Sequence, residues 1–81
     1  MTTIGFSDEA FKELFLRVLR LSESVYRDEL KIGDVEQWDS IAHLELVSEL
    51  ELAFGVQFAT EDLMGIKTAG ALRSRVAELR G

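Results

Sequence analysis

Apolar residues recur every three or four positions along most of the chain, the spacing of a helix with one buried face. Ser7 is placed to cap a first helix, whose predicted buried stripe is Phe11, Leu14, Phe15, Val18, Leu21 and Ser22. A second helix is predicted over residues 40–54. Gly55 ends it, because glycine suits the left-handed turn that closes many helices.

Two further segments follow the second helix. Thr60 is expected to cap one or two turns that stop at Gly65, and Thr68 to cap a last helix. Gly70 either weakens this last helix or lets a neighbour approach it closely. The predicted fold is all-α, a small bundle of three main helices plus one short helix. We expect a single domain over residues 1–81, since so short a chain has no room for a second core.

The helical pattern fails between the first and second helices, over roughly residues 23–37. Gly33 and the polar run after it predict a long loop, and such a loop in a small domain usually carries function or packs across the core. Its expected anchors are Val25, Leu30, Ile32 and Val35. Trp38, just before the second helix, either shapes the surface there or packs the loop onto the helix head.

The second helix has two distinct sides when residues are placed at about 100° intervals. The predicted core side consists of Leu44, Leu46, Val47, Leu50 and Phe54. The other side consists of Ile41, Glu45, Ser48 and Leu52. Large apolar side chains beside a carboxylate suit a transient protein contact. The alternative is that Ile41 and Leu52 touch the loop or the next helix.

The net charge of −6 is concentrated in the middle of the chain, where no Lys or Arg occurs between Ile32 and Ile66 but eight carboxylates do. An acidic centre repels nucleic acid and attracts basic protein surfaces. It could also serve only as a solvated face that keeps the protein in solution.

Composition also bears on the compartment. The chain has no cysteine, which fits a reducing environment, and charged residues interrupt every Leu-rich stretch, which excludes a membrane span. The first residues show neither the basic region nor the apolar run of a signal peptide. We therefore expect a cytoplasmic, monomeric protein without a membrane partner.

The order of helices, the long loop and three short motifs resemble those of an acyl carrier protein. The motifs are Asp39-Ser40-Ile41 at the start of the second helix, Glu45-Leu46-Val47 one turn on, and Phe54-Gly55-Val56 at its end. The resemblance extends from Phe11 to Leu79 and is greatest to discrete carriers encoded beside biosynthetic ligases and synthases. The chain departs from the common pattern at Trp38, Ile41 and Ala59, where smaller residues, leucine and proline are usual.

The resemblance implies that Ser40 is the attachment point of 4′-phosphopantetheine, transferred from coenzyme A by a separate magnesium-dependent phosphopantetheinyl transferase. Asp39 and Ile41, which flank it, would be recognised by that transferase. A phosphodiester at this position lies at the positive end of a helix, which favours an anion. Asp39 opposes the phosphate by like charge, so recognition or capping suits it better. Ser40 itself has a simpler explanation as the helix cap.

The function implied is carriage without catalysis: acyl intermediates, as in fatty acid or polyketide biosynthesis, travel as thioesters on the arm between partner enzymes. A loading ligase or synthase would dock through a basic patch. The expected docking surface is Ile41, Glu45, Ser48, Glu49 and Leu52, together with Glu51, which lies closer to the core side than Glu45 does. Two alternatives stay open. One is an aminoacyl or peptidyl carrier, and the other is an unmodified acidic adaptor that binds and regulates an enzyme.

Other chemistry is poorly supported. Ser40, Asp39 and His43 lie within one helical turn and cannot form the oriented relay of a serine hydrolase, so His43 is expected simply to be hydrogen-bonded. One histidine without cysteine does not predict a zinc site, and the acidic loop lacks EF-hand spacing. Met64 is expected to fill the core or to line an inner cavity for an acyl chain.

Overall fold

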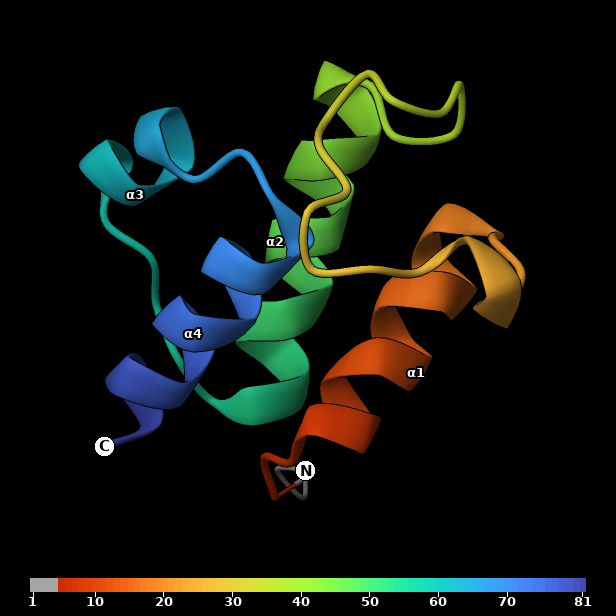
Figure 1. Ribbon diagram of the computed structural model, residues 1–81. Helices are drawn as coiled ribbons and strands as arrows, with labels where there is room; N and C mark the ends of the chain where they lie inside the picture. The colour runs from red at the N-terminus through yellow and green to blue at the C-terminus, as the bar shows by residue number, and fades with distance from the viewer. Residues whose placement is uncertain (1–4) are drawn as a thin grey trace.

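The computed structural model describes residues 5–81, which form four α-helices and one short 3₁₀ turn (Figure 1). The elements are α1 (Asp8–Leu19), η1 (Glu23–Val25), α2 (Ser40–Phe54), α3 (Thr60–Gly65) and α4 (Ala69–Arg80). The predicted all-α fold of three main helices and one short helix is confirmed, and α2 has the predicted bounds. Gly55 closes α2 in the left-handed conformation, with φ of 66°.

Two of the three predicted helix caps are present. Ser7 and Thr68 each accept a hydrogen bond from the backbone N–H three residues later, at 3.0 and 3.1 Å. The prediction for Thr60 is wrong, because it is already the first residue of α3 and Ala59 occupies the cap position. The carboxylate of Asp62 instead reaches back and accepts from the Ala59 N–H at 3.0 Å.

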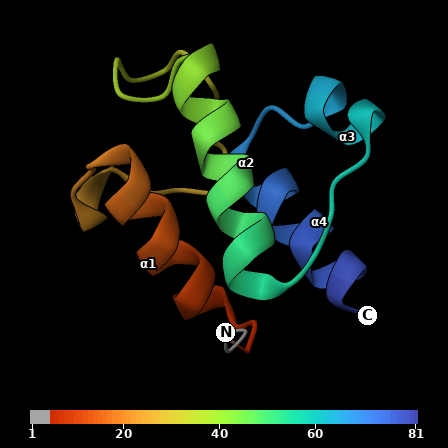
Figure 2. The same ribbon diagram turned by 180° about the vertical axis from the view of Figure 1, so that it is seen from behind.

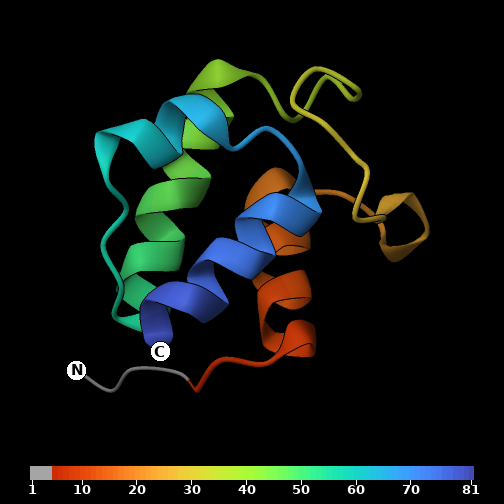
Figure 3. The same ribbon diagram turned by 60° about the vertical axis from the view of Figure 1, so that its left-hand side comes forward.

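Helix α2 is the central element of the bundle. It runs antiparallel beside α1, and α4 crosses its C-terminal half (Figure 1). The view from behind shows the same two neighbours (Figure 2). The short helix α3 lies across the head of α2 (Figure 3). No helix in the part of the chain that the structure describes has the length and apolar content to cross a membrane.

The core is built from one side of each main helix together with residues of the connections. Its most buried members are Phe11, Leu14, Phe15, Leu19, Leu30, Trp38, Leu46, Val47, Leu50, Phe54, Phe58, Ala69, Leu72 and Val76. The prediction that Leu44 belongs to this core is wrong, since its side chain is 57% exposed. His43 takes the buried position, and the next residue is turned about 100° around the helix, toward solvent.

The long loop is held against the bundle as predicted. Leu30 is fully buried, and the other three predicted anchors pack against the core. Trp38 has no exposed surface and meets the ring of Phe15 edge-on, with ring centroids 5.0 Å apart. The interpretation of Trp38 as a packing residue is therefore right, and its interpretation as a surface residue is wrong.

Gly70 lets the loop approach the start of α4 closely. Its N–H donates to the carbonyl of Asp28 at 2.9 Å, and the N–H of Ala69 donates to the carbonyl of Leu30 at the same distance. A Cβ at position 70 would lie 2.9 Å from the Cβ of Asp28. Close approach, the second of the two explanations for this glycine, is the correct one.

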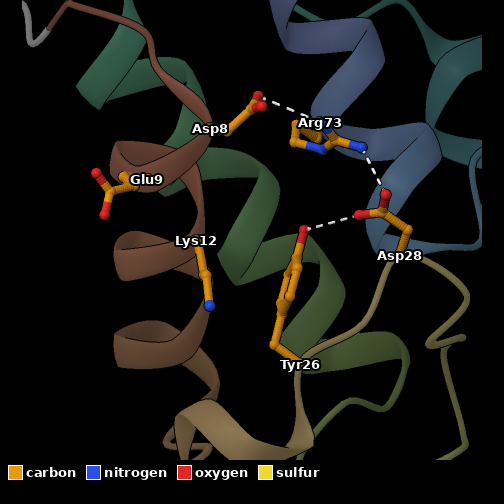
Figure 4. A pocket seen from close by; sticks show the side chains of 6 residues that line it. All are labelled: Asp8, Glu9, Lys12, Tyr26, Asp28 and Arg73. Atoms are coloured by element: carbon orange, nitrogen blue, oxygen red, sulfur yellow. Dashed lines mark hydrogen bonds and ion pairs between the residues drawn. The ribbon is translucent and has the colours of Figure 1, made fainter.

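Ion pairs tie α1, the loop and α4 together around a pocket of about 290 Å³ (Figure 4). The guanidinium of Arg73 pairs with Asp28 at 2.7 Å and with Asp8 at 3.3 Å, and the Tyr26 hydroxyl donates to Asp28 at 3.3 Å. Burial, assisted by the negative charge of Asp28, raises the pKa of Tyr26 to about 12. Ser40 is not among the residues that line this pocket.

The close approach at Gly70 predicts an unusual response to alanine. Gly70→Ala should lower the free energy of unfolding by about 1–3 kcal/mol, because the added methyl overpacks against Asp28. Urea unfolding followed by far-UV circular dichroism measures this. Gly65→Ala is the matched control, since nothing lies within 4 Å of its Cβ position, and it should be neutral or stabilising by up to about 1 kcal/mol. Equal effects of the two substitutions would show that position 70 is not crowded.

The Tyr26 network predicts a raised alkaline titration. The chain has one tyrosine, so phenolate absorbance reports on Tyr26 alone, and its midpoint should be about 12 while circular dichroism shows intact helices. Because the folded pKa exceeds the unfolded value of about 10, the stabilisation persists below pH 10 and is lost as the pH rises toward 12. Tyr26→Phe should lack this loss. A midpoint near 10 in the folded protein would refute the burial of the hydroxyl.

Candidate functional site

The head of α2 presents Ser40 while its neighbour caps the helix. The Asp39 carboxylate accepts a hydrogen bond from the Ala42 N–H at 2.8 Å, and Ser40 is the first helical residue. The simpler explanation of Ser40 as the helix cap is therefore wrong. Ser40 is exposed, and among residues 5–81 no hydrogen-bond partner holds its hydroxyl. The hydroxyl is thus available for chemistry.

The buried Trp38 fixes the backbone that leads into this helix head. Its carbonyl accepts from the Gly33 N–H at 2.8 Å, and its own N–H donates to the Val35 carbonyl at 3.2 Å. These bonds close the last turns of the loop directly beneath the start of α2. The backbone just before Ser40 is therefore held by hydrogen bonds, although Ser40 follows a long loop.

His43 lies in the first turn of α2, on its buried side, and is 5% exposed. Its Nδ1 accepts a hydrogen bond from the indole Nε1–H of Trp38 at 3.1 Å, which confirms the predicted hydrogen-bonded histidine. Burial, together with the nearby charge of Lys67, lowers the pKa of His43 below its usual value. In the described chain no hydrogen bond joins His43 to Ser40. The arrangement gives Ser40 no general base.

An open groove of about 350 Å³ lies between the head of α2 and α3. It is lined by Ser40, His43 and Leu44 of α2, by Leu63 and Met64 of α3, and by Ile32 and Lys67. Met64 is 73% exposed here, so both of its predicted positions, in the core or in an inner cavity, are wrong. The groove combines apolar walls with one cation, Lys67, and with the Ser40 residue at the head of α2.

A second groove, of about 410 Å³, lies on the other side of Ser40 between the end of α1 and the head of α2. Its polar lining includes Glu36, Gln37, Asp39, Glu45 and Arg20, and Ile41 contributes an apolar wall. Within the described residues, no three His, Asp or Glu side chains are grouped so as to hold a metal ion. This groove is a mainly acidic surface that a basic group would match.

The residues predicted to form a docking surface all lie on the exposed side of α2. They are Ile41, Glu45, Ser48, Glu49 and Leu52. Ile41 is 79% and Leu52 63% exposed, so neither is occupied by contacts with the loop or the next helix. The prediction that Glu51 belongs to this surface is wrong, because Glu51 is half-buried and its carboxylate accepts from the Phe58 N–H at 2.9 Å.

Two residues near Ser40 were missed at the sequence level. Leu44 was assigned to the core because its angular position lies at the edge of the apolar arc. Lys67 is the first basic residue after the acidic middle of the chain, and this position distinguishes it in the sequence. Its place beside the head of α2 follows only from the fold.

Comparison with known proteins agrees with this geometry. Residues 9–76 match the family model described as the phosphopantetheine attachment site. The solution structure of the holo acyl carrier protein from Geobacter metallireducens is similar, with a TM-score of 0.78 and 28% sequence identity. The alignment covers 88% of this chain and 82% of that one. No curated protein sequence matches significantly. The chain belongs to the family of phosphopantetheine-binding carrier domains, which are non-catalytic carriers.

Proposed function

We propose that this protein is a discrete acyl carrier whose 4′-phosphopantetheine arm is esterified to Ser40. The observation that carries the proposal is the exposed Ser40 hydroxyl at the first position of α2, with Asp39 supplying the cap. In the transfer, the Ser40 oxygen forms a bond to the β-phosphorus of coenzyme A. The pyrophosphate P–O bond breaks, adenosine 3′,5′-bisphosphate leaves, and the hydroxyl proton passes to the transferase.

The surroundings of Ser40 fit such a group. A phosphodiester on Ser40 would lie at the positive end of the fifteen-residue helix α2, and the Lys67 side chain lines the adjoining groove. When bound, the arm supplies a terminal thiol that holds the cargo as a thioester, and the chain has no cysteine of its own to do this. Tethering raises the concentration of the cargo at each partner's active site.

We propose acyl groups as the cargo, with aminoacyl or peptidyl carriage as the alternative. The similar solved structure is titled a holo acyl carrier protein, and this supports the first choice. We further propose that residues 1–81 act as a single, monomeric carrier domain. Its site of action would be the cytoplasm, where the absence of cysteine fits the reducing conditions.

The partner enzymes would meet the exposed side of α2. Ile41 and Leu52 supply apolar anchors, and Glu45 and Glu49 supply negative charge for a basic patch on the loading ligase or synthase. Leu44, at 57% exposure, extends the apolar part of this surface. The transferase would recognise Asp39 and Ile41, which line the acidic groove next to Ser40.

Incubation with coenzyme A, magnesium and a phosphopantetheinyl transferase tests the proposal. Intact mass spectrometry should show a gain of one phosphopantetheine on the wild-type chain and none on Ser40→Ala. Ser48→Ala is the matched control, because Ser48 is an exposed serine on the same helix, and it should gain the full mass. A folded wild-type chain that gains nothing would contradict the carrier assignment and favour the unmodified adaptor.

The docking surface predicts an effect of charge. Glu45→Lys combined with Glu49→Lys should slow loading of the modified protein by its cognate ligase or synthase at least about tenfold at low salt, since electrostatic attraction speeds association by 10–10³. Reactions quenched at successive times, at low and at high salt, and analysed by intact mass spectrometry give this rate. Glu9→Lys with Glu13→Lys places the same charge change on the exposed side of α1 and should have little effect. Equal rates for both pairs would remove α2 from the docking surface.

A further inference from the structure

The hydrogen bond between Trp38 and His43 fixes which ring nitrogen of His43 carries the proton. An indole N–H only donates, so Nδ1, at 3.1 Å from it, must accept. Both nitrogens of an imidazolium carry protons, so a ring whose Nδ1 accepts is a neutral imidazole with a single protonated nitrogen. Nε2 is therefore an N–H donor that points away from the indole.

This donor has no acceptor among the described residues. Nε2 is buried, and it forms no hydrogen bond with any residue of the described chain. A buried donor without a partner costs about 1–3 kcal/mol. Since the ring that carries it lines the groove beside Ser40, an acceptor entering that groove would remove the cost.

Lys67 adds a positive charge to the same groove. Its side chain is exposed, and within the described chain no carboxylate lies close enough to form an ion pair with it. It is also the charge that acts on His43. One neutral donor and one cation beside a serine hydroxyl are suited to a singly charged anion with several acceptor oxygens.

On the basis of the proposed modification of Ser40, we propose that His43 and Lys67 form a seat for the phosphodiester of the arm. The Nε2–H of His43 donates to one non-bridging oxygen and the Lys67 ammonium pairs with the phosphate charge. The seat directs the start of the arm along the groove past Leu44 and Met64. Ser40 and His43 are three residues apart on α2, so their Cβ atoms are neighbours at about 5–6 Å.

The phosphate gains access to Nε2 through movement of flexible side chains. Nε2 itself has less than 1 Å² of accessible surface. Met64, which is 73% exposed, and Lys67 are unbranched and line the groove, so both can swing aside at small cost. The apolar body of the groove then shields the hydrogen bond from water.

Nuclear magnetic resonance of the apo and enzymatically modified protein tests the seat. Because His43 is the only histidine, ¹⁵N-histidine labelling reports on it without ambiguity. The apo protein should show a protonated Nε2 and an accepting Nδ1. Modification should shift the Nε2–H resonances well beyond their linewidths, with nuclear Overhauser contacts to the methylene next to the phosphate. Lys67→Met should shift the ³¹P resonance of the phosphodiester, and Lys12→Met, on α1, should not.

Three outcomes would overturn the proposed phosphodiester seat. Modified protein whose His43 resonances equal those of the apo form would show that the phosphate lies elsewhere, while the carrier function stands. If the His43 signals move only after the thiol is acylated, the groove holds cargo and not the phosphodiester. A chain that gains no mass on incubation overturns the seat and the proposed function together, and mass spectrometry separates that case from the others.

Discussion

The burial of Trp38 is the contact on which the arrangement of the site depends. The indole lies at the end of a twenty-residue connection, packs edge-on against Phe15 of α1 and donates its one N–H to His43 of α2. One side chain thus joins the loop to two helices and satisfies its own polar group in the core. Without such an anchor, the ordering entropy of a long loop would leave the first turn of α2 poorly defined. With it, Asp39 is held in place to cap the helix and Ser40 projects outward.

The two sides of α2 therefore have different roles, one in packing and the other in contact with solvent. Helix α2 uses one side to hold α1 and α4, and leaves the other side, with Ser40 at its head, free of internal contacts. One carboxylate that could have been part of the exposed acidic surface is instead tied into the structure, because Glu51 accepts from the Phe58 N–H. Outside that surface, Asp28 pairs with Arg73 and accepts from Tyr26. The remaining exposed charges are available for partners.

Local signals in the sequence predicted much of this. The bounds of α2 and its closure at Gly55 follow from residue pattern and backbone preference, and both were right. Errors occurred where a neighbour in space decides the outcome. Leu44 is apolar but faces solvent, because the buried side of α2 is the one that carries His43 and Val47. Thr60 is a good capping residue, yet α3 begins at Thr60 itself, one residue earlier than a Thr60 cap would require. Nothing local reveals that Lys67 returns to the head of α2.

The central claim is that Ser40 is the residue that carries the arm. Tandem mass spectrometry of the peptide that contains Ser40, taken from the protein purified from its own cells, tests this most directly, since it requires neither an added transferase nor a substitution. The account predicts a phosphopantetheine adduct on that serine, with or without a bound cargo. A native peptide that is unmodified in all growth conditions, or an adduct on another residue such as Ser48, would contradict it.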